Sequence, residues 1–295
     1  MAKWRDLFGR PTKIRVPQQQ SEQKERPDVP DGAWTKCEAC GQLHYQKELA
    51  QNLFVCTKCR HHFVVGAWER IRQIADPGSF VERDAELDAG DPLQFPGYVE
   101  KRRQSEAKSG LKDAIVTGAA AVDGRRVALG VMDFHFIGGT LGQVVGERVV
   151  RLFEYATRER LPVILFSASG GARMQESILS LMQMQKTAAA VRLHSDAGLL
   201  YVSVLTHPTL AGVFGSFASL GDVIIAEPQA MVGFAGPRII ERTIRGQVPT
   251  DLQTAETVLA NGFVDLILPR KELRGTLVRL LALHQAAPEL ESAHA

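Results

Sequence analysis

The chain has 295 residues, 45% of them hydrophobic and 23% charged, with a formal net charge of +2. This composition fits one main globular domain with a smaller one, and a charge so near zero gives no electrostatic argument for nucleic acid as the main partner. No apolar run approaches the roughly 18 residues of a membrane span, and the basic N-terminus lacks the apolar core of a signal peptide, so we expect a cytoplasmic protein.

Residues 1–33 are rich in charge, proline and glutamine and are predicted to form a flexible basic and polar arm. Residues 34–65 differ abruptly, because they hold two CxxC pairs with fifteen residues between them. The four thiols are those of Cys37, Cys40, Cys56 and Cys59. This spacing predicts a four-cysteine zinc ribbon, whereas a redox function would need only one pair. Four thiolates leave no coordination position for water, so we expect structural zinc, with His61 and His62 as surface or second-shell residues.

A hairpin follows a helical and charged stretch that spans residues 66–112. Within that stretch, Lys101-Arg102-Arg103 is interpreted as a solvated helix face, and a phosphate-binding role is the less favoured alternative. Residues 114–122 and 126–134 are apolar and flank Asp123-Gly124, a strong signal for a two-residue turn. The sequence therefore predicts two antiparallel strands at this point.

Beyond the hairpin, short apolar segments run repeatedly through small-residue turns into helices. The predicted strands are 163–166, 200–205, 223–226 and 264–268. Three predicted helices begin after residue 142, at Gln175 and at the sequence GFAGPR (233–238), and two more span 254–261 and 271–284. This order favours an α/β domain over residues 66–285, followed by a tail at 286–295, with the turns exposing backbone amides at one end.

The turn at Gly170-Gly171 joins the strand 163–166 to a helix whose apolar residues, Ile178, Leu181 and Met182, recur at three and four. Orphan amides at a helix N-terminus suit a developing negative charge, although these glycines could equally serve only a tight turn. No hydrolase elbow, Walker motif or dinucleotide-binding GxGxxG turn is present, and no readable spacing gives His207 a carboxylate partner. We therefore expect chemistry in which the protein stabilises oxyanions and a cofactor moves protons.

From about Trp34 to Leu273 the sequence resembles the β subunit of the bacterial acetyl-CoA carboxylase carboxyltransferase. The stretches that carry the resemblance are WTKCEACGQ, VCTKCRHH, FSASGGARMQESILSLMQM, SLGDVIIAEP and GFAGPRIIERTI. The resemblance implies a crotonase-like fold, a spiral of ββα units, with an active site at a subunit interface. It also implies transfer of a carboxyl group from biotin, held on a carrier protein, to acetyl-CoA, giving malonyl-CoA for fatty acid synthesis.

The implied partners are an α subunit in an α₂β₂ assembly, the biotin carboxyl carrier protein, and a biotin carboxylase, which alone uses ATP. The implied oxyanion amides lie in a turn that the family writes Asp-Pro-Thr-x-Gly-Gly-Val. Here the turn reads HPTLAGV, so Ala211 precedes Gly212 and His207 replaces the aspartate. Alanine keeps its N–H, so the donor survives unless the turn needs a positive φ.

The remaining site residues follow from the resemblance as expectations. Gly170 and Gly171 are expected to be a second catalytic pair beside Ala211 and Gly212, lining the active-site floor. Arg173 is expected either to hold an acidic side chain or to meet a CoA phosphate. Residues expected to border the acyl-CoA pocket and the biotin entrance are Gly138, Gly139, Phe234, Gly236 and Arg238.

Two other functions stay open at this stage. One is a nucleic-acid-binding regulator that works through the ribbon, which is locally basic. Its basic residues are Lys36, Lys47, Lys58 and Arg60. The other is a carboxyltransferase or decarboxylase that acts on a larger acyl-CoA, since related folds serve those tasks.

Overall fold

The structure is a computed structural model that describes residues 33–245, 249 and 251–284. Except for Ala33, the predicted arm and the predicted tail lie outside the described residues. Among the described helices, none combines the length and the apolar character that crossing a bilayer requires.

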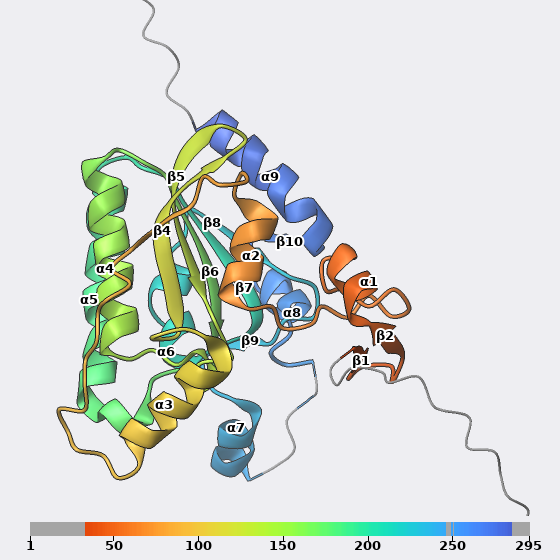
Figure 1. Cartoon of the computed structure of the whole chain (residues 1–295), viewed down its shortest axis with the longest axis horizontal. Coiled ribbons are helices and arrows are strands. Elements are labelled where there is room, and N and C mark those ends of the chain that lie inside the picture. Colours follow the sequence, from red (N-terminus) through yellow and green to blue (C-terminus); the bar gives the residue numbers. More distant parts are fainter. Residues whose placement is uncertain (1–32, 246–248, 250, 285–295) are drawn as a thin grey trace, which may run out of the picture.

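An eight-stranded sheet forms the centre of the described part (Figure 1). The strand order is β10-β8-β7-β6-β5-β4-β3, and β9 pairs with the carboxyl-terminal end of β7. The strands are β3 (Val81–Arg83), β4 (Ile115–Val122), β5 (Arg125–Met132), β6 (Val163–Ser169), β7 (Tyr201–Leu210), β8 (Val223–Ala226), β9 (Val232–Gly233) and β10 (Leu266–Ile267). From β5 to β10 the pairings are parallel, so the carboxyl ends of these strands meet at one edge.

The predicted hairpin is present as β4 and β5, joined at Asp123 and Gly124, which both have positive φ. All seven residues of β6 are buried, as expected for a parallel strand that is covered on both faces. Apolar side chains from the strands and from the helices on both faces form one continuous core. The core thus holds the carboxyl ends of β5, β6 and β7 in a fixed arrangement.

Helices cover both faces of the sheet, with α4 and then α5 on one face and α2 and α9 on the other (Figure 1). Their bounds, in chain order, are α2 (Ala67–Ile74), α3 (Tyr98–Ser109), α4 (Gln143–Arg158), α5 (Ser177–Asp196), α6 (Ala211–Phe214), α7 (Pro237–Ile244), α8 (Ala255–Ala260) and α9 (Arg270–Leu283). Short 3₁₀ turns lie at Ile137–Gly139, Met174–Glu176 and Phe217–Ser219.

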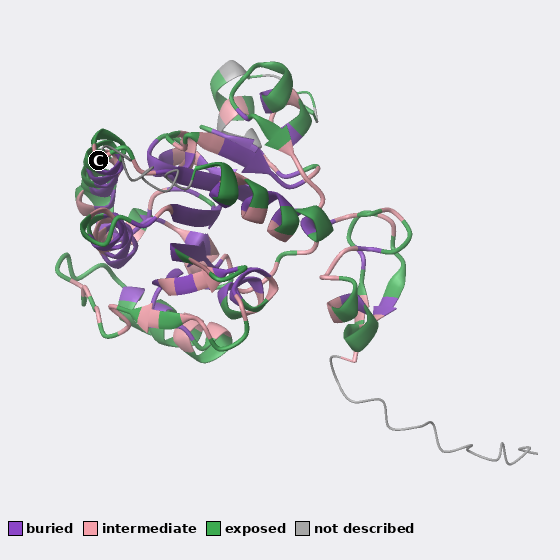
Figure 2. Ribbon diagram, turned by 90° about the horizontal axis from the view of Figure 1, so that it is seen from above, coloured by how far each residue is buried: buried purple, intermediate pink, exposed green. Residues whose placement is uncertain are grey.

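The first lobe of the described chain is small and comprises β1 (Trp34–Lys36), β2 (Leu43–Tyr45) and α1 (Gln46–Gln51). β1 and β2 pair antiparallel. Figure 2 shows this lobe beside the main body, with mostly exposed and intermediate residues. Its few buried side chains form too small an apolar core to stabilise the lobe alone, so a metal site is the expected stabiliser.

One sequence-based interpretation differs from the structure, and one helix is oriented in a way that the sequence does not indicate. Arg102 is buried and pairs with Asp88, so only Lys101 and Arg103 of the predicted solvated cluster face outward. The apolar face of α5 also lies on the outside, with Ile178 58% and Met182 54% exposed. The side chains that α5 buries are mainly polar or small, and Gly146 on α4 leaves room for one of them, Gln183.

Candidate functional site

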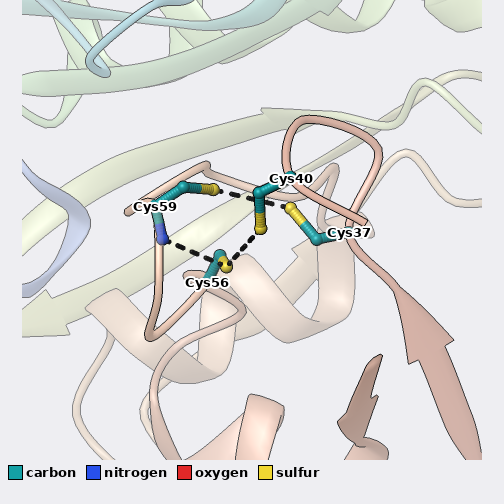
Figure 3. Close-up of side chains that lie close together, drawn as sticks. All are labelled: Cys37, Cys40, Cys56 and Cys59. Carbon is teal, nitrogen blue, oxygen red and sulfur yellow. Dashed lines mark hydrogen bonds between the residues drawn. The ribbon is translucent and has the colours of Figure 1, made fainter. Parts of the chain in front are cut away.

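The four cysteine thiols of the small lobe converge on one point (Figure 3). Their sulfur atoms all lie within 4.8 Å of one another, and the Cys37–Cys59 and Cys40–Cys56 Sγ separations are 3.6 and 3.7 Å. Four sulfurs at about 2.3 Å from one tetrahedral zinc lie about 3.8 Å apart, so this donor set fits zinc closely. No donor position is left for water, and the site is structural.

Histidines near the thiols have roles that the spacing of the cysteines does not reveal. His44 is buried, and its Nε2 lies 3.2 Å from the Cys56 Sγ, where it can donate to a metal-bound thiolate. His62 is also buried, but its Nε2 accepts the backbone N–H of Arg270 at 3.2 Å. His62 is therefore a contact between the ribbon and the main domain, not a surface residue.

Arg270 joins the ribbon to the main domain. Its Nη1 donates to the carbonyls of Leu53 and Phe54 at 2.9 and 3.2 Å, and its Nη2 donates to the carbonyl of Phe63 at 2.9 Å. The same guanidinium forms a bidentate pair with Glu227, with distances of 2.8 and 2.7 Å. One buried arginine thus donates hydrogen bonds to three carbonyls of the ribbon and to the carboxylate of Glu227, which directly follows β8.

Glu227 is the buried anion of this cluster and also pairs with Arg70 at 2.8 Å. Burial alone would raise the pKa of Glu227, but the charges of Arg70 and Arg270 outweigh burial and lower it to about 2. The carboxylate is therefore charged at neutral pH, balanced by two guanidinium groups. A cleft of about 780 Å³ lies between ribbon and domain beside Arg270, lined also by Arg60 and Lys271.

The predicted glycine loops lie together at the carboxyl ends of β5, β6 and β7. The Gly170 N–H donates to the Gly138 carbonyl at 2.9 Å, which joins the loop after β5 to the loop after β6. A Cβ on Gly139 would lie 1.9 Å from the Ala168 carbonyl oxygen, so the two backbones touch at this point. Any side chain at Gly139 would disrupt the fold, and substitution there cannot test a binding role separately.

The loop after β6 also meets the turn after β7. A Cβ on Gly171, whose φ is +119°, would lie 2.7 Å from the Ala211 Cβ, and Gly212 packs against Ala172 and Met184. Ala211 itself has φ +49°, a left-handed conformation that glycine adopts without strain. The turn therefore does need a positive φ at this position, and alanine adopts that conformation less readily than the glycine of the family pattern.

The amides of Gly170 and Gly171 both have hydrogen-bond partners within the chain. The Gly170 N–H donates to the Gly138 carbonyl, and the Gly171 N–H donates to the Ser169 Oγ at 3.0 Å. Both amides are thus used within the chain, which suits a floor better than an oxyanion donor.

The third loop of the region carries the predicted biotin-side residues. Phe234 is 66% exposed and stacks beside Gly215, where a Cβ would lie 3.0 Å from its ring. Gly236 precedes α7 and has open space around its Cβ position. Arg238 lies in α7, and its side chain is outside the described residues.

Arg173 is buried beneath the loops, where its guanidinium donates to Thr140 of the loop after β5, to the hydroxyl at 3.1 Å and to the carbonyl at 2.9 Å. Its guanidinium is fully buried and pairs with both oxygens of Asp113, at 2.5 and 3.0 Å, and with Glu176 at 3.2 Å. Glu176 in turn accepts the Gln143 N–H at 2.6 Å at the start of α4. Arg173 therefore holds acidic side chains, and in this structure it ties α4 to the loop after β6.

Comparison with known proteins agrees with this geometry. Residues 65–291 match the carboxyl transferase domain family, and residues 34–59 match the acetyl-CoA carboxylase zinc finger domain. These matches define a carboxyl transferase domain preceded by a zinc ribbon. The acetyl-coenzyme A carboxylase carboxyl transferase subunit beta of Desulforamulus reducens is 51% identical over 282 residues, 95% of this chain and 98% of that protein. The chain belongs to this family of carboxyl transferase beta subunits.

Solved structures give the same fold. A transcarboxylase 12S structure with methylmalonyl-coenzyme A bound matches 74% of the chain at 27% identity and a TM-score of 0.64, and the match spans 41% of that protein. A Pseudomonas malonate decarboxylase hetero-tetramer with malonate matches 78% of the chain, and 86% of the matched protein chain, at 25% identity and a TM-score of 0.63. The predicted crotonase-like α/β fold with an N-terminal zinc ribbon is confirmed.

The sequence predicted the glycine loops but not the buried ion pairs where the main domain meets the ribbon. Arg70, Glu227 and Arg270 come from segments far apart in the chain, so no local spacing connects them. One signal was available: Glu227 directly follows the apolar run Val223–Ala226, where a charged residue needs a buried partner.

Proposed function

We propose that this chain is the β half of the carboxyltransferase of acetyl-CoA carboxylase and carboxylates acetyl-CoA to malonyl-CoA. The observation that carries the proposal is the 51% identity, over nearly the full length of both chains, to a carboxyl transferase subunit beta. The gathering of three glycine loops at one sheet edge supports it. We keep the predicted division into a ribbon at 34–65 and a carboxyltransferase domain at 66–285, in a cytoplasmic enzyme.

The amides at Ala211 and Gly212 are proposed to stabilise the thioester oxygen as negative charge develops on it. Each preorganised amide donor of this kind contributes about 2.7–4 kcal/mol to lowering a barrier. Biotin, carried on a separate protein, supplies the carboxyl group and the base. The chain itself supplies position and charge stabilisation.

The other loops are proposed to shape the site around these donors. Gly170 and Gly171 form its floor, and Gly138 and Gly139 border the acyl-CoA pocket. Phe234, Gly236 and Arg238 border the biotin entrance. Arg173 supports the floor from beneath through its ion pairs with Asp113 and Glu176.

The α subunit is proposed to cover the exposed apolar residues of α5 and complete the site in an α₂β₂ assembly. At the start of α5 these are Ile178, Leu181 and Met182, and Met174 of the preceding 3₁₀ turn lies beside them; all four are between 49% and 83% exposed. A patch of this kind marks a protein–protein interface. The carrier protein and the biotin carboxylase, which uses ATP, are the further proposed partners.

Substitution at Gly170 tests the function, since this residue is exposed and its φ is not in the left-handed region. With the α subunit and a carboxybiotin carrier, the wild-type chain is expected to form malonyl-CoA from acetyl-CoA. Gly170→Leu is expected to lower this rate at least about tenfold, because the side chain fills the proposed floor. Gly275→Leu, in open space on α9, is the matched control and should leave the rate unchanged.

Two results would change the proposal. A complete complex that carboxylates propionyl-CoA faster than acetyl-CoA would point to a larger acyl-CoA. A complex that forms no carboxylated product, together with a ribbon that binds RNA or DNA with strong salt dependence, would favour the nucleic-acid function.

A further inference from the structure

His207 lies near the end of β7, four residues before Ala211. Its Nδ1 accepts the Met231 backbone N–H at 3.1 Å. Thr209, two residues further along β7, donates its N–H to the Met231 carbonyl at 2.8 Å. Both polar backbone groups of Met231 are thus held by the end of β7.

Met231 directly precedes β9, so its position sets that of the strand. β9 pairs with β7 at Thr209 and Leu210, immediately before the turn at Ala211. The chain then continues from β9 to Phe234, whose ring lies beside Gly215. The contact between His207 and Met231 therefore fixes two proposed site loops relative to each other.

Only the unprotonated Nδ1 of His207 can accept this hydrogen bond. In the neutral ring with the proton on Nε2, Nδ1 carries a lone pair directed at the Met231 N–H. Protonation places a second N–H opposite the first, so the bond is lost and the Met231 amide has no acceptor at this position. The contact depends on pH for this reason.

The groups that face His207 come from three segments. Burial, together with the charge of His61 in the ribbon, lowers its pKa, whereas Glu38 in the ribbon and Glu227 after β8 raise it, and the net direction is downward from 6.5. Because the folded pKa is depressed, the stabilising neutral form is present above pH 6.5 and is lost as the pH falls through the folded pKa. The contact is therefore intact at neutral pH.

We propose that neutral His207 is a positioning residue for carboxyl transfer, which holds the Met231 amide and so fixes the Phe234 loop against the Ala211 turn. Acidification releases this loop and lowers the rate. This inference rests on the proposed function for its activity readout.

Replacement of His207 by Asn tests the idea, because the Asn Oδ1 occupies the place of Nδ1, accepts a hydrogen bond and does not titrate. In the reconstituted complex, kcat/KM for malonyl-CoA formation by the wild-type chain is expected to fall about fivefold or more as the pH is lowered below 6.5 and through the pKa of His207. His207→Asn should lose this acid limb relative to the wild type. His207→Phe, which has no acceptor, should be slow at every pH, and the control His284→Asn, at the exposed end of α9, should keep the wild-type profile.

Hydrogen exchange of the Met231 amide gives a second readout in the chain alone. After correction for intrinsic rates, its protection should fall on acidification in the wild type and persist in His207→Asn. An acid limb that is unchanged in His207→Asn, or a protection factor independent of pH in the wild type, would overturn the inference. If the complex forms no malonyl-CoA at any pH, the proposed function fails, and the exchange experiment still decides whether His207 holds Met231.

Discussion

Ala211 combines an unfavourable backbone conformation with a methyl group that faces the neighbouring loop. Its φ of +49° lies in the left-handed region, and its Cβ faces Gly171 across the meeting point of two loops. A left-handed conformation costs an alanine about 1 kcal/mol relative to glycine. The turn that carries the proposed oxyanion amides is thus held in place by its neighbours against this strain.

Ala211→Gly is therefore expected to raise the free energy of unfolding by about 1 kcal/mol, as measured by chemical denaturation. The amide donor is retained, so carboxyl transfer in the complete complex should be at least as fast as in the wild type. Proline at this position is not a usable test, since its φ near −65° is incompatible with the observed turn.

Ala172→Gly is the matched control, because Ala172 lies in the adjoining loop with a φ outside the left-handed region. It should lower the free energy of unfolding by about 0.5–1 kcal/mol through added freedom of the unfolded chain. Equal losses in the two variants would show that the Ala211 turn is not strained.

At this scale the residues predicted from sequence are those whose signal is local. The four cysteines and the glycine pairs stand at readable spacings, and the structure brings them together. His44 and Asp113 could not be predicted, because their partners, Cys56 and Arg173, are identified only by the fold.

Among the elements, the ribbon depends on two different supports. The zinc ion is expected to hold β1 and β2 together, and Arg270 with His62 joins the lobe to the main domain. The first support is internal to the lobe and the second is external, so the two can be removed separately.

Removal of zinc by a chelator is expected to unfold the ribbon and leave the large sheet intact, since structural zinc contributes about 10–16 kcal/mol in such modules. Hydrogen exchange should show loss of protection in β1 and β2 and near-native protection in β6 and β7. Protected β1 and β2 amides in a fully chelated protein would contradict a zinc-dependent lobe.

Glu227→Gln removes the negative charge between Arg70 and Arg270 and keeps the shape of the side chain. We expect a loss of about 3–5 kcal/mol in the free energy of unfolding, because two buried guanidinium groups lose their counter-ion. Since the pKa of Glu227 is lowered from 4.5 to about 2, its contribution is complete above pH 4.5 and is lost as the pH falls toward 2.

Denaturation at pH 7 and at pH 3 measures both effects, and the variant should lose less stability on acidification than the wild type. Glu272→Gln, an exposed carboxylate that lines the same cleft, is the control and should behave as the wild type. If the free energy of unfolding of Glu227→Gln is less than 1 kcal/mol below that of the wild type, the cluster does not stabilise the docked ribbon.

The elements themselves were largely predictable, because β4, β5, α8 and α9 carry clear periodicity, turn and capping signals. The short strand β9 was missed, since two residues give no pattern. The orientation of α5 was also beyond the sequence, because its apolar stripe faces outward and its buried face is largely polar.

For the whole molecule, the exposed stripe of α5 is the feature that a single chain leaves unexplained. Large apolar side chains on a helix that also packs inward imply a further partner surface. The proposed α subunit accounts for it and places the interface beside the loop after β6.

The double variant Ile178→Glu/Leu181→Glu is expected to keep the stability of the chain, because both side chains are already exposed. It should abolish stable association with the α subunit, as measured by light scattering after gel filtration. Leu283→Glu, 78% exposed at the end of α9, should still associate. Normal assembly of the double variant would exclude this face as the interface.

The docking of the ribbon by Arg270 also sets an order of events during synthesis. The ribbon leaves the ribosome before the main domain, and Arg270, whose N–H anchors His62, follows His62 by 208 positions. At a synthesis rate of about 5–20 residues per second, Arg270 is made roughly 10–40 seconds after His62. During that interval only captured metal can keep the nascent lobe folded, so a cell short of zinc would release this polypeptide with an open N-terminal lobe.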